Sequence, residues 1–119
     1  MDSRDSLEAM IAFFNSDVVA EMNVPWQTAA INVLLNSLRG STYVNDLEFS
    51  QSHGILIIRS ARTANSDLTV AVEPQKQALV VHRGKSLKEL TESVSRSNGT
   101  NVAPELLVQT IYAMLEEER

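Results

Sequence analysis

The residues most suggestive of chemistry lie at 82–86, which read His-Arg-Gly-Lys-Ser and stand between an aliphatic run and a segment with helical spacing. A strand, then Gly-Lys-Ser, then a helix is the layout of a phosphate-binding loop. That motif also requires a glycine five residues before Gly84, and the residue there is Leu79, within the aliphatic run. The sequence therefore does not predict a nucleotide-binding loop at this position.

Ser86 and Glu89 have the spacing of a capping box, in which each side chain accepts a backbone N–H at the start of a helix. We therefore interpret this segment as a helix beginning. The basic residues His82, Arg83 and Lys85 flank that beginning, where backbone donors and the helix dipole favour anions. An alternative is that these three residues, with Ser86, contact an anion or an acidic partner.

No other constellation in the sequence predicts a catalytic, cofactor-binding or metal-binding residue. His53, in a predicted turn, and His82, at a predicted strand end, lack metal-ligand spacing and are interpreted as surface or edge residues. The chain contains no cysteine, which excludes disulfides, thiol catalysis and cysteine-type zinc sites. No G-x-S-x-G nucleophile motif occurs. The sequence leaves catalysis open but favours a non-enzymatic protein without a cofactor.

Charge and aromatic content argue against nucleic acid as a partner. The formal net charge of −5 repels a phosphate backbone. Arg59 and Arg62 could form a basic patch with Arg83 if the strands pair suitably, but no aromatic residue is interleaved with them. Glu73 alternates with apolar residues and is interpreted as solvent-facing. We expect a protein partner instead.

Length and composition predict one soluble globular domain spanning residues 1–119. The apolar fraction is 44% and the charged fraction 21%, as in soluble globular proteins. The polar, acidic N-terminus does not resemble a secretory signal, and no apolar stretch approaches the ~20 residues of a membrane span. We therefore expect a cytoplasmic protein that does not contact membranes.

Apolar spacing predicts an α+β fold with two N-terminal helices, a roughly four-stranded antiparallel meander and two C-terminal helices packed on one face of the sheet. The predicted helices are residues 7–18, 25–39, 86–96 and 104–115, and the first of these is predicted either as one helix or as two short ones divided at residues 15–17. The predicted strands are residues 43–49, 54–58, 67–73 and 78–82. The short connections between these strands favour antiparallel pairing.

Trp26 and Phe13 are the candidate interface anchors. Trp26 begins an amphipathic helix, and Phe13 lies outside the main apolar stripe of the first segment. Tryptophan is enriched at interface hot spots, and twofold dimers are the commonest oligomers. We expect a homodimeric protein-binding module of chaperone, adaptor or inhibitor type. The alternative is an anionic-ligand binder or an enzyme of another class, acting near His82, Arg83 and Lys85.

Overall fold

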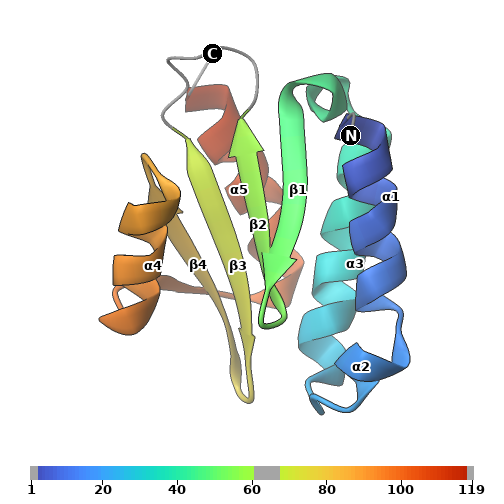
Figure 1. Ribbon diagram of the computed structural model, residues 1–119, viewed down its shortest axis with the longest axis vertical. Helices are drawn as coiled ribbons and strands as arrows, with labels where there is room; N and C mark the ends of the chain where they lie inside the picture. Colours follow the sequence, from blue (N-terminus) through green and yellow to red (C-terminus); the bar gives the residue numbers. More distant parts are fainter. Residues whose placement is uncertain (1–2, 61–67, 118–119) are drawn as a thin grey trace.

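The computed structural model describes residues 3–60 and 68–117. Its chain begins with helices, continues through a β-meander and ends with helices (Figure 1). The helical elements are α1 (Ser3–Phe14), α2 (Asp17–Ala20), α3 (Pro25–Arg39), η1 (Thr42–Asp46), α4 (Leu87–Ser95), η2 (Pro104–Leu106) and α5 (Leu107–Glu117). Among the described residues, none of these helices has the length and apolar character needed to cross a membrane.

Five strands in the described part of the chain form one antiparallel sheet, ordered β1-β2-β3-β4-β5. The strands are β1 (Leu47–Ser52), β2 (Ile55–Ser60), β3 (Thr69–Gln75), β4 (Ala78–Gly84) and β5 (Thr100–Val102). The first four follow one another as a meander. The chain then leaves through α4 and returns as β5 alongside β4.

The β1–β2 turn consists of His53 and Gly54, which both have positive φ, 54° and 80°. Two such residues are the requirement of the tight hairpin turn that matches the natural twist of paired strands. A Cβ added to Gly54 would lie 2.5 Å from Cε of Met22, so the turn packs closely against the segment that leads into α3. The prediction that His53 lies in a turn is confirmed.

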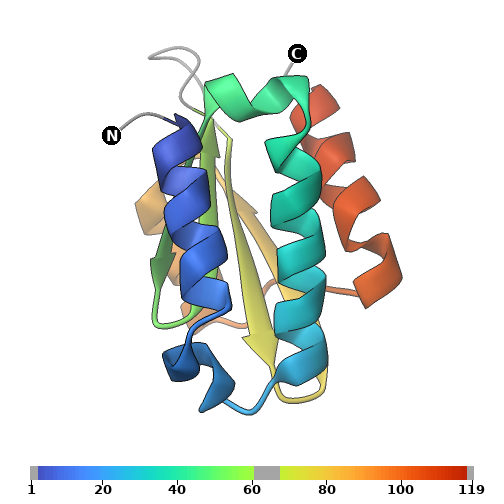
Figure 2. The ribbon, with the colours of Figure 1, turned by 90° about the vertical axis from the view of Figure 1, so that its right-hand side faces the viewer.

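Alternating side chains divide the sheet into two faces. Helices α1, α3 and α5 cover one face, and α4 lies on the other (Figures 1 and 2). The main core lies between the sheet and the three helices. Its fully buried leucines and isoleucines are Leu7, Ile31, Leu34, Leu35, Leu38, Leu47, Leu56, Ile58, Leu79, Leu107 and Ile111. Burial of these side chains from water is the main source of the stability of this layer.

The predicted α+β architecture with an antiparallel meander is confirmed. The first predicted helical segment is two helices, α1 and α2, which was one of its two predicted forms. The prediction of a strand from residue 43 is wrong for residues 43–46, which belong to the 3-10 helix η1, and β1 begins at Leu47. The structure adds the fifth strand β5, in a segment that the sequence indicated only as a loop. The predicted first residue of the third strand, Asp67, lies outside the described residues.

The two C-terminal helices lie on opposite faces of the sheet, in contrast to the predicted single face. Helix α5 has three fully or nearly buried residues, Leu107, Ile111 and Leu115, and joins the main core. Helix α4 buries only Leu90, which the small second cluster under it can accommodate. The apolar stripe of each helix therefore matches the face on which it packs.

Candidate binding groove

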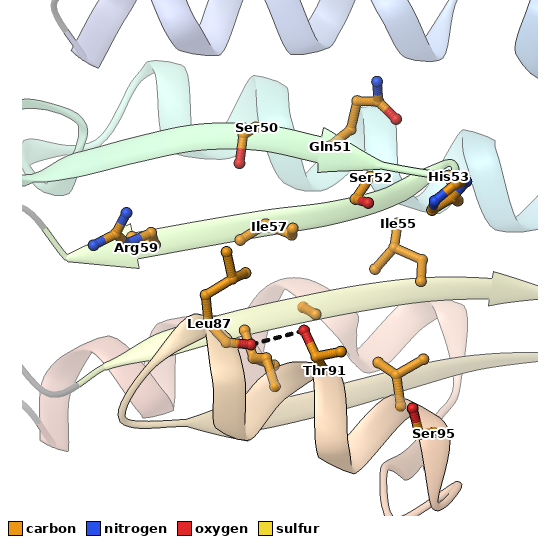
Figure 3. Close-up of a pocket in the computed structure, with 13 residues that line it drawn as sticks. Ser50, Gln51, Ser52, His53, Ile55, Ile57, Arg59, Leu87, Thr91 and Ser95 are labelled. Carbon is orange, nitrogen blue, oxygen red and sulfur yellow. Dashed lines mark hydrogen bonds between the residues drawn. The ribbon is translucent and has the colours of Figure 1, made fainter.

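A groove of about 400 Å³ lies between α4 and the part of the sheet that α4 leaves open (Figure 3). Its volume is within the range of sites that take small ligands or a few side chains of a partner. The groove is lined by Ser50, Gln51, Ser52, His53, Ile55, Ile57, Arg59, Ala71, Leu87, Leu90, Thr91, Val94 and Ser95. These residues come from β1, the β1–β2 turn, β2, β3 and α4.

The floor of the groove is apolar because β2 carries apolar residues on both of its faces. Leu56 and Ile58 point into the main core, whereas Ile55 and Ile57 belong to the second cluster with Leu90. Helix α4 packs on β3 and β4. The β1–β2 side of this face is therefore open, and Leu87, on the α4 side of the groove, is 52% exposed.

Among the described residues that line the groove, none has a negative charge. Arg59 and His53 are the only titratable residues among those that line it, and they lie at opposite ends of the groove (Figure 3). The charged residues of α4, which are Lys88, Glu89 and Glu92, are absent from the lining. The described lining is therefore neutral to basic, and the carboxylate of Glu48, opposite Arg59 in the β1–β2 register, lies just outside it.

A second polar feature, the chain Glu73–His82–Ser93, fastens α4 to the sheet. Nε2 of His82 lies 2.9 Å from Oε2 of Glu73, and Nδ1 lies 2.8 Å from Oγ of Ser93. Because a carboxylate accepts hydrogen bonds, Nε2–H donates to Glu73, and a neutral ring then accepts the Ser93 hydroxyl proton at Nδ1. We call these three residues the polar clamp.

The interpretation of His82 as a surface or edge residue is wrong, because the residue is only 1% exposed. On β4, His82 lies on the face that α4 covers, and its two ring nitrogens both have partners. A polar side chain can be buried at low cost when its donors and acceptors are satisfied in this way. Glu73, interpreted as solvent-facing, keeps only 20% of its side chain exposed and supplies one of those partners.

The polar clamp contains a hydroxyl, an imidazole and a carboxylate in series, which is the composition of a nucleophile relay. None of its three residues lines the groove. The loop after α4 closes over the imidazole: a Cβ added to Gly99 would lie 2.4 Å from Cγ1 of Val80 and 2.7 Å from Cε1 of His82. The arrangement positions α4, and with it one wall of the groove.

The predicted anion-contact residues do not converge on one site. Ser86 Oγ accepts the N–H of Glu89 at 3.2 Å, and the Glu89 carboxylate accepts the N–H of Lys85 at 2.6 Å. The helix cap at Ser86 is therefore confirmed, with Glu89 accepting the N–H of Lys85 in place of that of Ser86, and the carboxylate of Glu89 lies where an external anion would bind. Arg83 pairs with Glu117 at 2.6 Å, and His82 is buried. The anion contact stays a prediction.

Arg59 and Arg83 lie on opposite faces of the sheet. Arg59 lines the groove, whereas Arg83 reaches Glu117 of α5 on the helical side. The alternation of side chains along paired strands separates them. The predicted basic patch is therefore wrong for this pair, and Arg62 lies outside the described residues.

Of the two candidate anchors, only Trp26 is exposed. Phe13 packs against the core and makes an edge-to-face contact with Phe14, with ring centroids 5.1 Å apart. Trp26 is 41% exposed and Val33 is 61% exposed. Both residues lie on the same helical stripe of α3, which ends at Ser37. The hydroxyl of Ser37 lies 2.8 Å from the hydroxyl of Tyr112 in α5.

The exposed apolar surface continues from α3 to α5. Leu106, in the turn that opens α5, is 44% exposed, and η2 packs against α3. We call Trp26, Val33 and Leu106 the α3 strip. Within the described ranges, no group of three or more histidines, aspartates and glutamates is placed to hold a metal ion.

Sequence reasoning missed the groove, although one signal for it was present. The run of aliphatic residues at 55–58 has apolar side chains at both alternating positions, which is typical of a strand with apolar contacts on both faces.

Comparison with protein-family models gave no match, and comparisons with curated proteins and with solved structures gave no significant match. The site therefore has to be interpreted from its own geometry.

Proposed function

We propose that this protein is a non-enzymatic protein-binding module that holds an apolar segment of a partner in the groove beside α4. The observation that carries the proposal is the groove itself. Its floor of Ile55 and Ile57 and its exposed wall residue Leu87 are apolar, and its rim is made mostly of uncharged polar side chains, with Arg59 at one end. An apolar centre with a polar rim is the usual anatomy of a surface that buries a partner's side chains.

Binding fits this groove better than catalysis does. The groove lining contains serine and threonine hydroxyls, but its one histidine, His53, lies in the hairpin turn at one end. In the described part of the chain, the only hydrogen bonds of a relay type are those of the polar clamp, which is not part of the lining. A nucleophile needs a base within hydrogen-bonding reach, and the polar clamp uses its base to hold α4.

Photo-crosslinking in the native host tests this function. A benzophenone amino acid placed at Ser50, on the β1 rim of the groove, is expected to form adducts with a partner protein. The same amino acid at Val18, which is 64% exposed on α2, is the matched control. It is expected not to form the adduct that Ser50 forms. Leu87→Glu should reduce the Ser50 adduct by about tenfold, because a charge has to be desolvated against the partner.

The proposed function would be wrong if Ser50 and Val18 gave the same adducts, or if Leu87→Glu left the Ser50 adduct unchanged. Circular dichroism of Leu87→Glu is the folding control. Because Leu87 is 52% exposed, the variant is expected to keep its fold.

We also propose that two copies of the chain associate through the α3 strip. Helix α3 has no charged residue between Pro25 and Leu38, whereas the whole chain has a formal charge of −5. Two acidic copies repel each other over most of their surfaces. An uncharged, partly apolar helix face is a surface on which they can approach without that repulsion.

The prediction for self-association is a dimer that Val33→Glu converts to a monomer. Light scattering after size-exclusion chromatography, over a range of protein concentrations, measures the change. Val18→Glu introduces the same charge at an equally exposed valine of α2 and should leave the dimer intact. A wild-type chain that is monomeric at every concentration would remove this part of the proposal.

A further inference from the structure

We infer that the groove receives an amphipathic α-helix of the partner, which packs beside α4 with an acidic side chain near Arg59. This inference rests on the proposed function and adds the conformation and chemistry of the bound segment. Three features of the groove lead to it: the unequal helical covering of the sheet, the hydrogen-bonding state of the strands, and the charge of the lining.

The first feature is the width of the open surface. In the described chain, α1, α3 and α5 cover one face of the sheet, and only α4 lies on the other (Figures 1 and 2). Helix α4 packs mainly on β3 and β4 and reaches β2 where Leu90 contacts Ile57, which leaves β1 and the Ile55 end of β2 open. Neighbouring strands are about 4.8 Å apart, so the half of the sheet formed by β1 and β2 is about 10 Å wide. A helix has a diameter of about 10 Å, so one helix fits beside α4.

The second feature is that an extended segment would have no backbone partners here. The groove lies over the sheet face, where strand N–H and C=O groups already bond to neighbouring strands. At the β1 edge, the N–H of Phe49 donates to Oγ of Ser6 in α1 at 3.2 Å. A buried extended chain would therefore leave polar backbone groups unsatisfied, whereas a helix bonds its own.

The apolar residues of the groove are arranged for the stripe of such a helix. Ile55 and Ile57 form the floor along β2, and Leu87 with Val94 comes from α4. A helix with apolar residues at i, i+3, i+4 and i+7 can place them on the floor and against α4 at once. Its polar flank then faces the hydroxyl of Ser50 on β1.

The third feature is charge. Among the described residues of the lining, Arg59 is the only arginine or lysine, and there is no carboxylate. Glu48 lies directly opposite Arg59 in the β1–β2 register but is not part of the lining, and the two form no ion pair in the part of the chain that is described. An acidic residue of the bound helix can therefore pair with the Arg59 guanidinium, which favours carboxylate geometry.

Selection from a displayed library of helical peptides on the full-length protein tests the inference. Enriched peptides are expected to have an apolar stripe of helical period and an acidic residue near one end. Leu87→Glu should weaken their binding by about tenfold or more, and Val18→Glu should not. Arg59→Glu should change the preferred end residue from acidic to basic, since the charge pair would be reversed.

Enriched peptides with alternating apolar residues, or binding unaffected by Leu87→Glu, would overturn the helical occupant. Binding of a dansyl-labelled fatty acid in the groove without any enriched peptide would also overturn it, because the occupant would then be a single acyl chain. If the Ser50 cross-link forms and no helical peptide is enriched, this inference alone fails. If the Ser50 cross-link is absent as well, the proposed function fails with it.

Discussion

Replacing His82 with alanine is expected to lower the free energy of unfolding by about 3 kcal/mol, which is the largest effect predicted for a single residue outside the main core. Two costs combine. The truncation leaves a cavity where an imidazole of 1% exposure was packed between β4 and α4. It also leaves Glu73 and Ser93 without their hydrogen-bond partner. Urea denaturation followed by circular dichroism measures the change.

Variants of Glu73 distinguish the contribution of the hydrogen bond to His82 from the contribution of side-chain packing. Glu73→Gln keeps an acceptor oxygen for the Nε2–H of His82, so its effect should be about 1 kcal/mol or less. Glu73→Ala removes the acceptor from a nitrogen that is buried and should cost clearly more than Glu73→Gln. Equal effects of the two Glu73 variants would show that the hydrogen bond to His82 contributes little.

Loss of the polar clamp should also loosen α4, which forms one wall of the groove. Helix α4 buries only Leu90, so the bond from Ser93 to His82 is a large part of what fixes its C-terminal half. Elements with few buried contacts open at lower free energy than the core does. Amide hydrogen exchange in α4 should therefore accelerate in His82→Ala well before exchange in α3 or α5 changes.

The architecture could be predicted from the sequence because its signals are local. Pro25 and Gly40 bound α3 by known preferences for the first helical position and the position after the last. Period-two alternation predicted β3, an aliphatic run after a turn predicted β4, and the spacing of Ser86 and Glu89 predicted the start of α4. Each of these features depends on residues that are close in the sequence.

The position of α4 and the polar clamp could not be predicted in this way, because they depend on pairing between distant residues. Glu73, His82 and Ser93 come together only when β3 pairs with β4 and α4 folds over both. Gln27 gives a second example: its side-chain amide is completely buried and donates to the carbonyls of Gln75 and Lys76 in the β3–β4 turn. A polar residue on an amphipathic helix gives no local sign of such a partner.

The candidate anchors show the same limit. Phe13 and Trp26 are both large aromatic residues in helical segments, and apolar periodicity does not separate them. Phe13 packs on the core because α1 crosses both α3 and β1. Trp26, in the first turn of α3, stays 41% exposed. Which aromatic residue is available to a partner is decided by helix packing, which sequence spacing alone does not determine.

Gly99→Ala is expected to destabilise the protein by about 1–3 kcal/mol, through overpacking and not through lost contacts. The new Cβ would lie 2.4 Å from Cγ1 of Val80 and within 2.8 Å of the ring of His82. Both neighbours are buried side chains on β4, so neither can move into solvent. The loop after α4 must shift instead, and that shift disturbs the His82–Ser93 bond. A lower thermal midpoint in calorimetry measures the change.

Gly40→Ala is the matched control for that substitution. A Cβ at Gly40 would meet only the carbonyl oxygen of Ser37 at 3.8 Å, an ordinary contact distance, and should leave stability nearly unchanged. If Gly99→Ala acts through the polar clamp, its effect and that of Ser93→Ala should be less than additive, because both variants weaken the same contact. Full additivity would mean that Gly99 is needed only for the path of its own loop, and that α4 keeps its place without it.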